Sequence, residues 1–252
     1  MSETAMEEGR RERNPIASAT RLVAILSEHT DDAVGVRELA RLLDLTASSV
    51  QKTLERAAEA GLVSALPEGR WTLGWELYRI AANARHKLPF GNVQPVLDAV
   101  RDASAETAVL TIYDAGRGER MFVAASESRH SVRFVPPLMQ WLPMHVGATA
   151  LAILAFRPEA ERGALIARSG LSDQERQSLS TTLDKIQDGG SAVSHDQVNI
   201  GGSAIAVPVQ SRGGVSASLG VIMPKERFES ADLLKLGQLL QGAAAQISGA
   251  VG

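Results

Sequence analysis

A short run of small and polar residues carries the clearest candidate chemistry of this chain, which is hydrogen bonding to nucleic acid. The run holds Thr46, Ala47, Ser48, Ser49, Gln51 and Lys52. The amide of Gln51 has donor and acceptor groups that fit adenine, and the ammonium of Lys52 can reach guanine or a phosphate. We expect Thr46 to lie near a backbone phosphate. The same residue types also suit the exposed face of an ordinary helical hairpin, so their placement decides the interpretation.

Two short helices joined by a tight turn would position these side chains, and the stretch from Val36 to Glu55 predicts them. Apolar residues repeat at helical spacing on both sides of the turn, with Leu39, Ala40 and Leu43 before it and Val50 and Leu54 after it. Asp44 tolerates the positive φ that such a turn needs, and Thr46 has the side-chain oxygen of an N-cap. The pattern is typical of a helix-turn-helix whose second helix enters the DNA major groove. An αα-hairpin in a helical core would show the same apolar faces.

A predicted β-hairpin follows the second helix and favours the DNA-binding interpretation. Residues 62–66 and 70–73 have the composition of two short strands, and Pro67-Glu68-Gly69 between them is a turn sequence. A helix-turn-helix followed by such a hairpin is a winged helix. Arg70, at the hairpin tip, is then placed to meet a phosphate or the minor groove.

The overall charge does not mark the chain as a nucleic-acid binder. The formal net charge is −3, and residues 13–87 contain ten Lys and Arg against nine Asp and Glu. DNA affinity must therefore come from a few well-placed basic residues rather than from a uniformly basic face. The candidates are Arg37, Lys52, Arg56 and Arg70. A dimer would double the phosphate contacts.

The composition indicates a globular, cytoplasmic protein of two domains. The chain has 252 residues, of which 44% are hydrophobic, and it has no apolar run long enough to span a bilayer. The N-terminus is charged throughout, so we expect no secretory signal. Cysteine is absent, which excludes disulfides, thiolate zinc sites and a cysteine nucleophile.

No catalytic or cofactor motif is found that fits its required context. The sequence contains neither a G-x-S-x-G elbow nor a G-x-x-x-x-G-K-[ST] phosphate loop, and Gly116-Arg117-Gly118 lacks the third glycine of a dinucleotide fingerprint. The five histidines are scattered without the H-E-x-x-H spacing of a zinc helix. His195 beside Asp196 fits a polar loop after a strand better than a catalytic pair. We therefore expect no enzyme activity, no metal and no cofactor.

The order of predicted elements divides the chain into a winged helix over residues 14–74, a linker helix over 75–89 and a second domain over 90–252. Asn14-Pro15 is a strong helix start, and residues 29–35 are expected to form a polar loop. The linker carries apolar residues at helical spacing from Leu77 to Leu88. It offers more apolar surface than one neighbour needs, so we expect it to be the seam of a homodimer.

The second domain is predicted to be α+β, with helices packed on an antiparallel sheet. Strands are expected at residues 108–113, 121–125, 131–135, 191–194, 203–210 and 216–222. Residues 140–145 are expected to form a loop, and residues 147–156 a buried helix. Ser172 and Glu175 form a capping-box sequence that opens a further helix, and a last helix begins near Ser230. The expected buried stripe of the last helix is Leu233, Leu236, Leu240, Ala243 and Ile247.

The second domain also offers the parts of a small-molecule cavity. Its large apolar side chains in or near loops are Met121, Phe134, Trp141 and Met144. The backbone at Gly147 and Ala148 can supply N–H donors to a carboxylate or an amide. Thr149 or His145 can add a side-chain hydrogen bond, which would give a mostly apolar pocket with a few polar groups. The opposite wall is expected at Ala204, Gly220 and Ile222. Core packing explains the same residues about as well.

The order and spacing of several motifs resemble the IclR family of bacterial transcriptional regulators, from about Asn14 to Val251. The motifs are LARLLDLTASSVQKTLE, GRWTLG, LPMHVGATALAILA, DQVNIGGSAIAVPV and LGVIMP. The resemblance implies a winged helix-turn-helix joined by a linker helix to a GAF-like α/β effector domain with an antiparallel sheet. It also implies a homodimer, or a dimer of dimers (a homotetramer), on double-stranded operator DNA.

The chain departs from the family at positions that help some members to hold small carboxylates. Ala150-Leu151 stands where Gly-Lys or Gly-Arg is usual. Ala204 replaces a cysteine, and Gly220 and Ile222 replace serines. The loss of these polar groups argues against a glyoxylate-like or pyruvate-like effector. It favours a larger, more apolar one, such as an aromatic acid or its derivative, and it equally allows a pocket that binds nothing.

The sequence therefore predicts a DNA-binding transcriptional regulator that is controlled by a small molecule and does not bind membranes. A repressor is favoured over an activator. Two alternatives stay open. One is an enzyme that acts on a small molecule in the second domain. The other is an interaction module whose winged helix binds protein.

Overall fold

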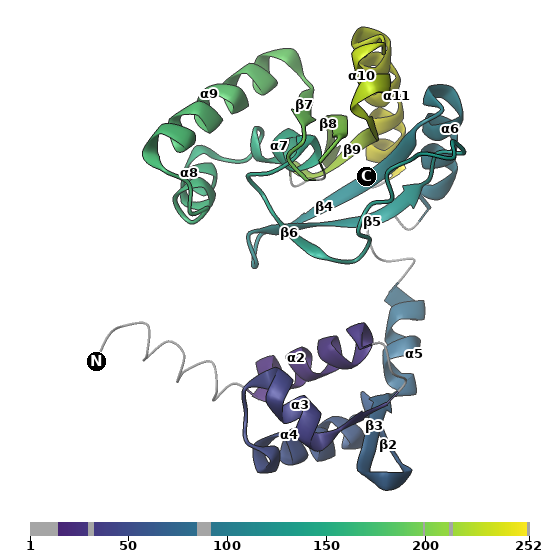
Figure 1. The fold of residues 1–252 in the computed structure, drawn as a ribbon, viewed down its shortest axis with the longest axis vertical. Coiled ribbons are helices and arrows are strands. Elements are labelled where there is room, and N and C mark those ends of the chain that lie inside the picture. The colour runs from purple at the N-terminus through teal and green to yellow at the C-terminus, as the bar shows by residue number, and fades with distance from the viewer. Residues whose placement is uncertain (1–14, 30–32, 85–91, 199, 212–213, 251–252) are drawn as a thin grey trace. The chain divides into compact units, whose positions relative to one another are not determined.

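A computed structural model describes residues 15–29, 33–84, 92–198, 200–211 and 214–250 (Figure 1). The chain divides between Leu88 and Pro89 into two units. Asn14 as a helix cap, Leu88 in the linker helix and a domain start at Phe90 are expectations that lie outside the described residues.

Three helices in the described part of the N-terminal unit share one apolar core. They are α2 (Pro15–Glu28), α3 (Val36–Leu43) and α4 (Ala47–Glu59). The predicted apolar faces of α3 and α4 are buried together with Leu22 and Leu26 of α2. Asp44 lies between α3 and α4 in the left-handed region at φ 55°, and Thr46 caps α4 by accepting a hydrogen bond from the N–H of Ser49 at 3.2 Å. The predicted helix-turn-helix is therefore confirmed.

A small antiparallel sheet completes the winged helix. Its described strands are β1 (Val34–Gly35), β2 (Val63–Leu66) and β3 (Arg70–Leu73), in the order β1-β3-β2. The turn Pro67–Gly69 joins β2 to β3, with positive φ at its last two residues. The predicted polar loop over 29–35 is wrong at its end, because Val34 pairs with Trp71 and is only 1% exposed. A two-residue strand is too short to show a periodic pattern in the sequence.

Helix α5 (Trp75–Ala84) follows the wing and carries a row of exposed apolar side chains. Trp75 is 84% exposed, Tyr78 72% and Ile80 47%, and no residue of the helix is buried against the described part of the chain. Trp75 and Tyr78 contact each other edge to face, with ring centroids 6.4 Å apart. Contiguous apolar surface of this kind is typical of an interface.

Among the described residues, the C-terminal unit contains one six-stranded antiparallel sheet, which confirms the predicted α+β class. Its strands in spatial order are β6 (Trp141–Pro143), β5 (Glu119–Ser126), β4 (Thr107–Asp114), β9 (Gly214–Pro224), β8 (Gly202–Ser211) and β7 (Ala192–His195). β4 and β9 pair in the middle of the sheet, from Thr107 opposite Ile222 to Ile112 opposite Ala217. This sheet is the rigid frame on which the cavity described below is built.

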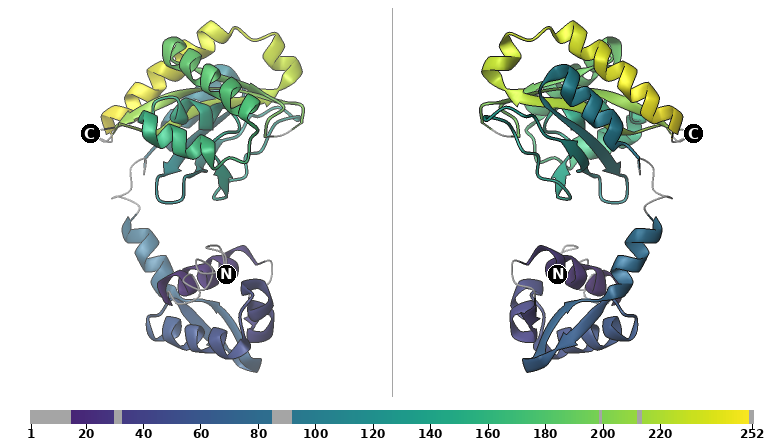
Figure 2. Two further views of the ribbon diagram at one scale, coloured as in Figure 1. Left: turned by 90° about the vertical axis from the view of Figure 1, so that its left-hand side faces the viewer. Right: turned by 90° about the vertical axis from the view of Figure 1, so that its right-hand side faces the viewer.

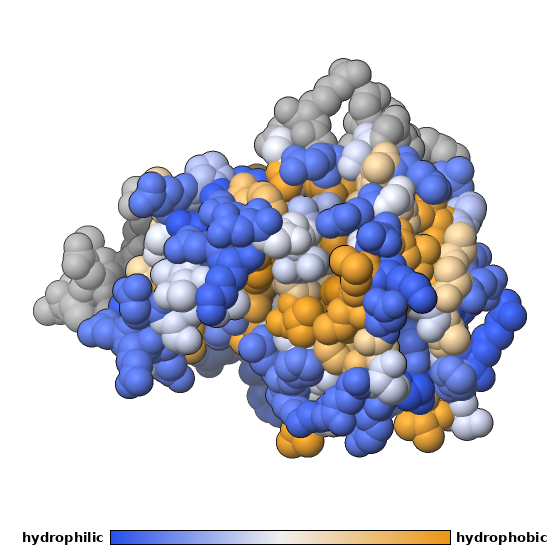
Figure 3. Space-filling view, turned by 90° about the horizontal axis from the view of Figure 1, so that it is seen from above, coloured by the Kyte–Doolittle hydropathy of each residue, from blue (hydrophilic) through white to orange (hydrophobic). Residues whose placement is uncertain are grey.

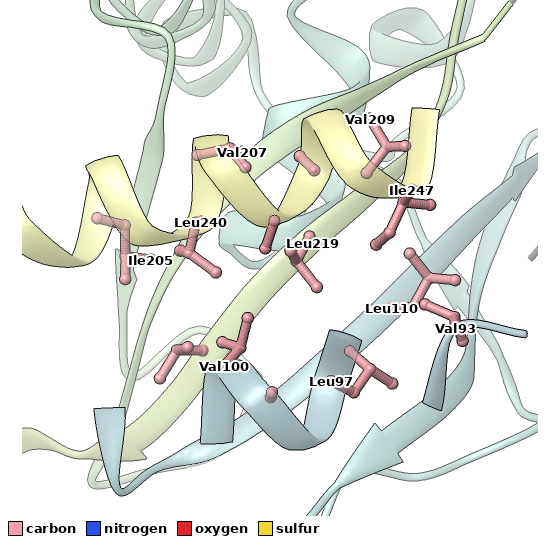
Figure 4. Close-up of a cluster of buried hydrophobic side chains, with 14 of the residues drawn as sticks. Val93, Leu97, Val100, Leu110, Ile205, Val207, Val209, Leu219, Leu240 and Ile247 are labelled. Atoms are coloured by element: carbon pink, nitrogen blue, oxygen red, sulfur yellow. The ribbon is translucent and has the colours of Figure 1, made fainter. Parts of the chain in front are cut away.

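Helices cover both faces of the sheet, as the two views of Figure 2 show in turn. One face carries α6 (Gln94–Ser104) and α11 (Leu233–Ala250), and the other carries α7 (Ala148–Leu154), α8 (Glu159–Ala167) and α9 (Asp173–Gly189). Leu97, Leu219 and Leu240 belong to the buried cluster between α6, α11 and the sheet (Figure 4). Ser172 and Glu175 form the predicted capping box at the start of α9. Every residue of α7 is buried, in line with its small apolar sequence.

The edge of the sheet beside β5 differs from the prediction. Residues 131–135 form no strand, and two of their carbonyl groups accept hydrogen bonds from side chains instead of from a neighbouring strand. Thr107 donates to the carbonyl of Phe134 at 3.0 Å, and Arg227 donates to the carbonyl of Val132 at 3.1 Å. The edge strand is instead β6, which lies in the predicted loop and pairs with β5 from Glu119 to Met121.

Two helices were missing from the prediction, and one residue that was expected to be buried is exposed. The missing helices are α8 and the five-residue α10 (Lys225–Glu229). Leu233 was expected in the buried stripe of the last helix, but it lies in the first turn of α11 and is 38% exposed. Leu240, Ala243 and Ile247 of that stripe are buried as predicted.

Exposed apolar residues are not confined to α5. Figure 3 shows hydrophobic residues gathered in the middle of the face seen from above, with hydrophilic residues around them. Leu234 of α11 is among the exposed large apolar side chains of the C-terminal unit, as are Val132, Met139 and Ile200. The exposure of single apolar residues therefore does not identify a partner surface.

Candidate functional site

The first candidate site is the outer face of α4. Thr46, Ala47, Ser48, Ser49 and Lys52 are all exposed there, as the sequence predicted for residues that contact DNA. The first turn is ordered by its own hydroxyls, because Thr46 Oγ1 lies 2.9 Å from Ser49 Oγ and 3.1 Å from Ser48 Oγ. The face is thus preformed and polar.

Gln51 is less free than the sequence suggested. It is partly buried, and its Nε2 donates to Glu55 Oε1 at 2.9 Å, one helical turn further along α4. The amide keeps a second N–H and its carbonyl oxygen for other partners. Sequence analysis missed Glu55, although the i, i+4 spacing of Gln and Glu on a helix was visible.

The two predicted arginines of this unit, Arg37 and Arg70, are both placed close to Gly35 of β1. Arg70 is exposed at the start of β3, opposite Gly35 of β1. Arg37 is exposed in the first turn of α3, two residues after Gly35. Both guanidinium groups are therefore available to solvent on the edge of the winged helix.

The second candidate site is a cavity in the C-terminal unit, between the segment before β6, the start of α7 and strands β7 to β9. It has an empty volume of about 480 Å³, including its open mouth. Its lining is mostly apolar and consists of Phe122, Phe134, Val135, Pro136, Pro137, Gly147, Ala148, Thr149, Ser194, Gln197, Val198, Gly202, Ser203, Ala204 and Ile222. A mostly apolar cavity with a few polar groups is the usual form of a small-molecule site.

The structure brings together six of the predicted cavity residues and separates the other five. Phe134, Gly147, Ala148, Thr149, Ala204 and Ile222 line the cavity. Gly220 lies behind Thr149, where a Cβ on the glycine would come within 2.9 Å of the Thr149 methyl group. Met121 and Trp141 pair across β5 and β6 at the sheet edge, where Arg117 lies over the Trp141 ring at 4.8 Å.

Met144 and His145 belong to a different hollow. They line it together with Arg117, Gly118, Glu119, Pro143, Leu154, Leu165, Arg168 and Ser169. Burial lowers the pKa of His145 from its usual value, which favours its neutral form. The apolar wall expected from Trp141 and Met144 is therefore supplied by Phe122, Phe134 and Pro137 instead.

Two lining residues that the sequence did not reveal already occupy the backbone donors of the cavity. Gln197 Oε1 accepts the hydrogen bond of the Gly147 N–H at 2.8 Å, and Ser194 Oγ accepts that of Ala148 at 2.9 Å. The predicted donors therefore face the cavity but are satisfied by side-chain oxygens. Gln197 lies fifty positions after Gly147 in the chain, so no local pattern connects the two.

A buried arginine lies next to this cavity. Arg120 of β5 is only 1% exposed, and its burial lowers the pKa of the guanidinium to about 10, so it stays charged at neutral pH. Its Nη2 donates to the carbonyl of Val146 at 3.0 Å, and its guanidinium lies 4.9 Å from the centre of the Phe122 ring. Sequence analysis did not select it, because Arg120 lies just before the predicted strand over residues 121–125, where an arginine is typical of an exposed turn.

Two other kinds of feature are absent from the described residues. No helix there is long and apolar enough to cross a membrane. No group of three or more His, Cys, Asp or Glu side chains in this part of the chain is placed to hold a metal ion.

Comparison with known proteins gives a family match and relatives that are HTH-type transcriptional regulators. Residues 89–249 match the family model described as the C-terminal domain of the bacterial transcriptional regulator IclR. The HTH-type transcriptional repressor AllR of Escherichia coli strain K12 is 24% identical over 241 residues, which cover 91% of this chain and 88% of AllR.

Solved structures agree on the fold. An IclR transcriptional regulator from Alicyclobacillus acidocaldarius has a TM-score of 0.80 at 22% identity, over 94% of this chain and 98% of that chain. An IclR homologue from Microbacterium hydrocarbonoxydans, solved in complex with 4-hydroxybenzoate, has a TM-score of 0.77 at 18% identity, over 94% and 98% of the two chains. At these identities the likeness establishes the fold alone.

Proposed function

The chain belongs to the IclR family of bacterial transcriptional regulators, and we propose that it is a repressor that releases operator DNA when a small molecule binds in its C-terminal unit. The observation that carries the DNA-binding part is the exposed polar face of α4 within a winged helix. Its relative AllR, which aligns over most of the chain, is a repressor, and this supports repression over activation.

The proposed contacts follow from the exposed side chains. α4 would enter the major groove with Ser48, Ser49 and Gln51 toward the bases and Lys52 toward guanine or a phosphate. The hydrogen bond from Gln51 to Glu55 fixes the amide, which lowers the entropy lost when it contacts adenine. Arg37, Arg70 and Thr46 would contact the backbone and set the register.

The proposed effector is an aromatic acid or a derivative of one. Phe122, Phe134 and Pro137 supply flat apolar surfaces in the cavity, while Ser194 and Gln197 supply polar groups. The homologue from Microbacterium hydrocarbonoxydans, which shares the fold, was solved with 4-hydroxybenzoate. A ligand shifts the regulator only if it prefers the arrangement that does not bind DNA.

A mobility-shift experiment tests the proposed function. Purified full-length chain is added to labelled DNA from upstream of its own gene and to a shuffled duplex of equal length, at low salt. Retardation of the upstream DNA at concentrations that leave the shuffled duplex free supports a regulator. Failure to retard any upstream fragment, together with turnover of a small molecule, would identify an enzyme instead.

We also propose a homodimer whose seam includes α5. The double variant Trp75→Glu, Tyr78→Glu places two charges on the exposed apolar row, so it should be monomeric at micromolar concentrations where the wild type is dimeric or tetrameric. Light scattering after gel filtration measures the mass directly. Leu234→Glu alters an equally exposed apolar residue of α11 and serves as the matched control, which should keep the wild-type mass. A monomeric wild type, or an unchanged mass for the double variant, would rule out this seam.

A further inference from the structure

Arg120 is an unusual residue because its charge is buried without an acidic partner. The side chain is 1% exposed, and no carboxylate forms an ion pair with it among the described residues. Its Nε and Nη1 have no hydrogen-bond partner in the described part of the chain. A buried charge with unsatisfied donors is costly, so its presence requires an explanation.

A second, partly buried arginine in the same unit shows what a structural role looks like here. The guanidinium of Arg157 lies over the Tyr113 ring at 5.2 Å, much as that of Arg120 lies over Phe122. Arg157, however, donates to Glu161 through both Nε and Nη2, at 3.0 and 2.7 Å, and to the carbonyl of Val215 at 2.8 Å. The two sites differ in that Arg157 has an anion beside it, and Arg120 does not.

The guanidinium of Arg120 lies directly behind the cavity wall. Arg120 and Phe122 are two residues apart on β5 and therefore point to the same face, and Phe122 lines the cavity. Gly147 also lines the cavity, and a Cβ built on it would lie 3.3 Å from Arg120 Nη2. The same position would lie 2.8 Å from Val198 Cγ2. The side chains of Arg120 and Val198 therefore both pack against Gly147, whose N–H donates a hydrogen bond to Gln197.

A second unsatisfied polar group lies on the same face of the sheet. Thr111 of β4 is fully buried, pairs with Phe122, and its Oγ1 has no hydrogen-bond partner in the described residues. Unpaired buried hydroxyls are uncommon in native proteins. Thr111 and Arg120 do not line the cavity themselves, but both lie on the sheet face of Phe122, which does, and dry packing leaves their polar atoms unsatisfied.

We propose that Arg120 is the buried counter-charge of an anion-binding subsite, which recognises the carboxylate of the effector. A carboxylate at this wall supplies the acceptors that Nε and Nη1 lack, and it takes the place that Gln197 and Val198 now fill beside Gly147. The aromatic or apolar body of the ligand then lies against Phe122 and Phe134. The inference rests on the proposed function of the cavity, and it assigns to Arg120 the discrimination between an acid and its neutral amide.

Thermal melting of ligand-free variants gives the first test. Arg120→Met keeps the apolar stem and removes the unpaired charge, so its melting temperature should rise by about 2 °C or more. Arg157→Met removes a paired arginine and leaves the Glu161 carboxylate with the Tyr113 hydroxyl, so its melting temperature should fall by about 2 °C or more. A fall for Arg120→Met, or a failure to fold, would show that Arg120 serves the fold and would overturn the proposal.

Ligand-dependent melting gives the second test. The wild type is melted with benzoate, 4-hydroxybenzoate, and the corresponding neutral amides, against sodium chloride at equal ionic strength. The melting temperature of the wild type should be higher with the acids than with either the amides or sodium chloride. Arg120→Met should lose this preference, and Arg120→Lys should keep part of it, because lysine retains the charge without the planar guanidinium.

Two further outcomes would overturn the proposal. One is an acid preference that survives in Arg120→Met, which would place the anion site elsewhere. The other is a wild type that responds to the acids no more than to chloride. Retardation of operator DNA by the same wild-type preparation is measured in parallel. Retardation without an acid preference removes only the role of Arg120, whereas no retardation removes the proposed regulator itself.

Discussion

Gly74→Ala should unfold the winged helix while leaving the C-terminal unit folded. Gly74 joins β3 to α5, and its N–H donates to the carbonyl of Leu62 at 2.8 Å. A Cβ at this position would lie 2.0 Å from the carbonyl oxygen of Gly61 and 2.8 Å from the carbonyl carbon of Leu62. These are backbone atoms that cannot rotate away, so the free energy of unfolding of the N-terminal unit should fall by about 3 kcal/mol or more.

Calorimetry on the full chain measures this effect. In the wild type, the N-terminal unit should unfold in a thermal transition. Gly74→Ala should move this transition below the measured temperature range or abolish it, and the variant should no longer bind operator DNA. Gly35→Ala is the matched control, because nothing lies within 4 Å of a Cβ there, and it should melt like the wild type. A Gly74→Ala variant whose transitions match those of the control would contradict the close approach seen here.

Lys52→Ala combined with Arg70→Ala should lower operator affinity by about 100-fold or more at moderate salt, because a dimer loses four cationic contacts at once. The dependence of log K on log salt should flatten by about 3 to 4 for the same reason. Gln51→Ala should instead relax sequence preference, since a bidentate base contact discriminates by about 1–3 kcal/mol.

Fluorescence anisotropy with operator and shuffled duplexes at several salt concentrations separates these effects. Lys185→Ala removes one exposed positive charge from α9 in the other unit, so it is the control for loss of charge outside the proposed interface and should bind like the wild type. Melting curves should show that Lys52→Ala and Arg70→Ala leave the fold intact, because both side chains are exposed. Unchanged affinity and salt slope in the double variant would remove α4 and the wing from the DNA interface.

Local rules were sufficient where the interaction joins residues close in the chain. Asp44 in the left-handed turn, Thr46 as N-cap and the Ser172–Glu175 capping box all depend on contacts within three or four residues, and all three were predicted correctly. The buried helix α7 was also predicted, because its composition leaves no polar face to expose.

Long-range pairing was beyond the sequence. Val34 is in a strand because it pairs with Trp71, which is distant in the sequence. Trp141 is in a strand because it pairs with Met121. The oxygen that Gln197 places on the Gly147 N–H comes from the loop after β7. Arg120 is the clearest case, since burial without a partner is a property of the assembled sheet and its coverings, which no local pattern encodes.

Operator affinity measured with and without a bound acid tests whether a ligand of the C-terminal unit releases the DNA. Full-length chain is titrated into a labelled operator duplex, alone and with saturating concentrations of each of a panel of aromatic acids. At least one acid should raise the apparent Kd by about 10-fold or more, within the usual range of allosteric coupling, while its neutral amide should not. An operator that is not bound without ligand, or a Kd that no acid changes, would contradict it.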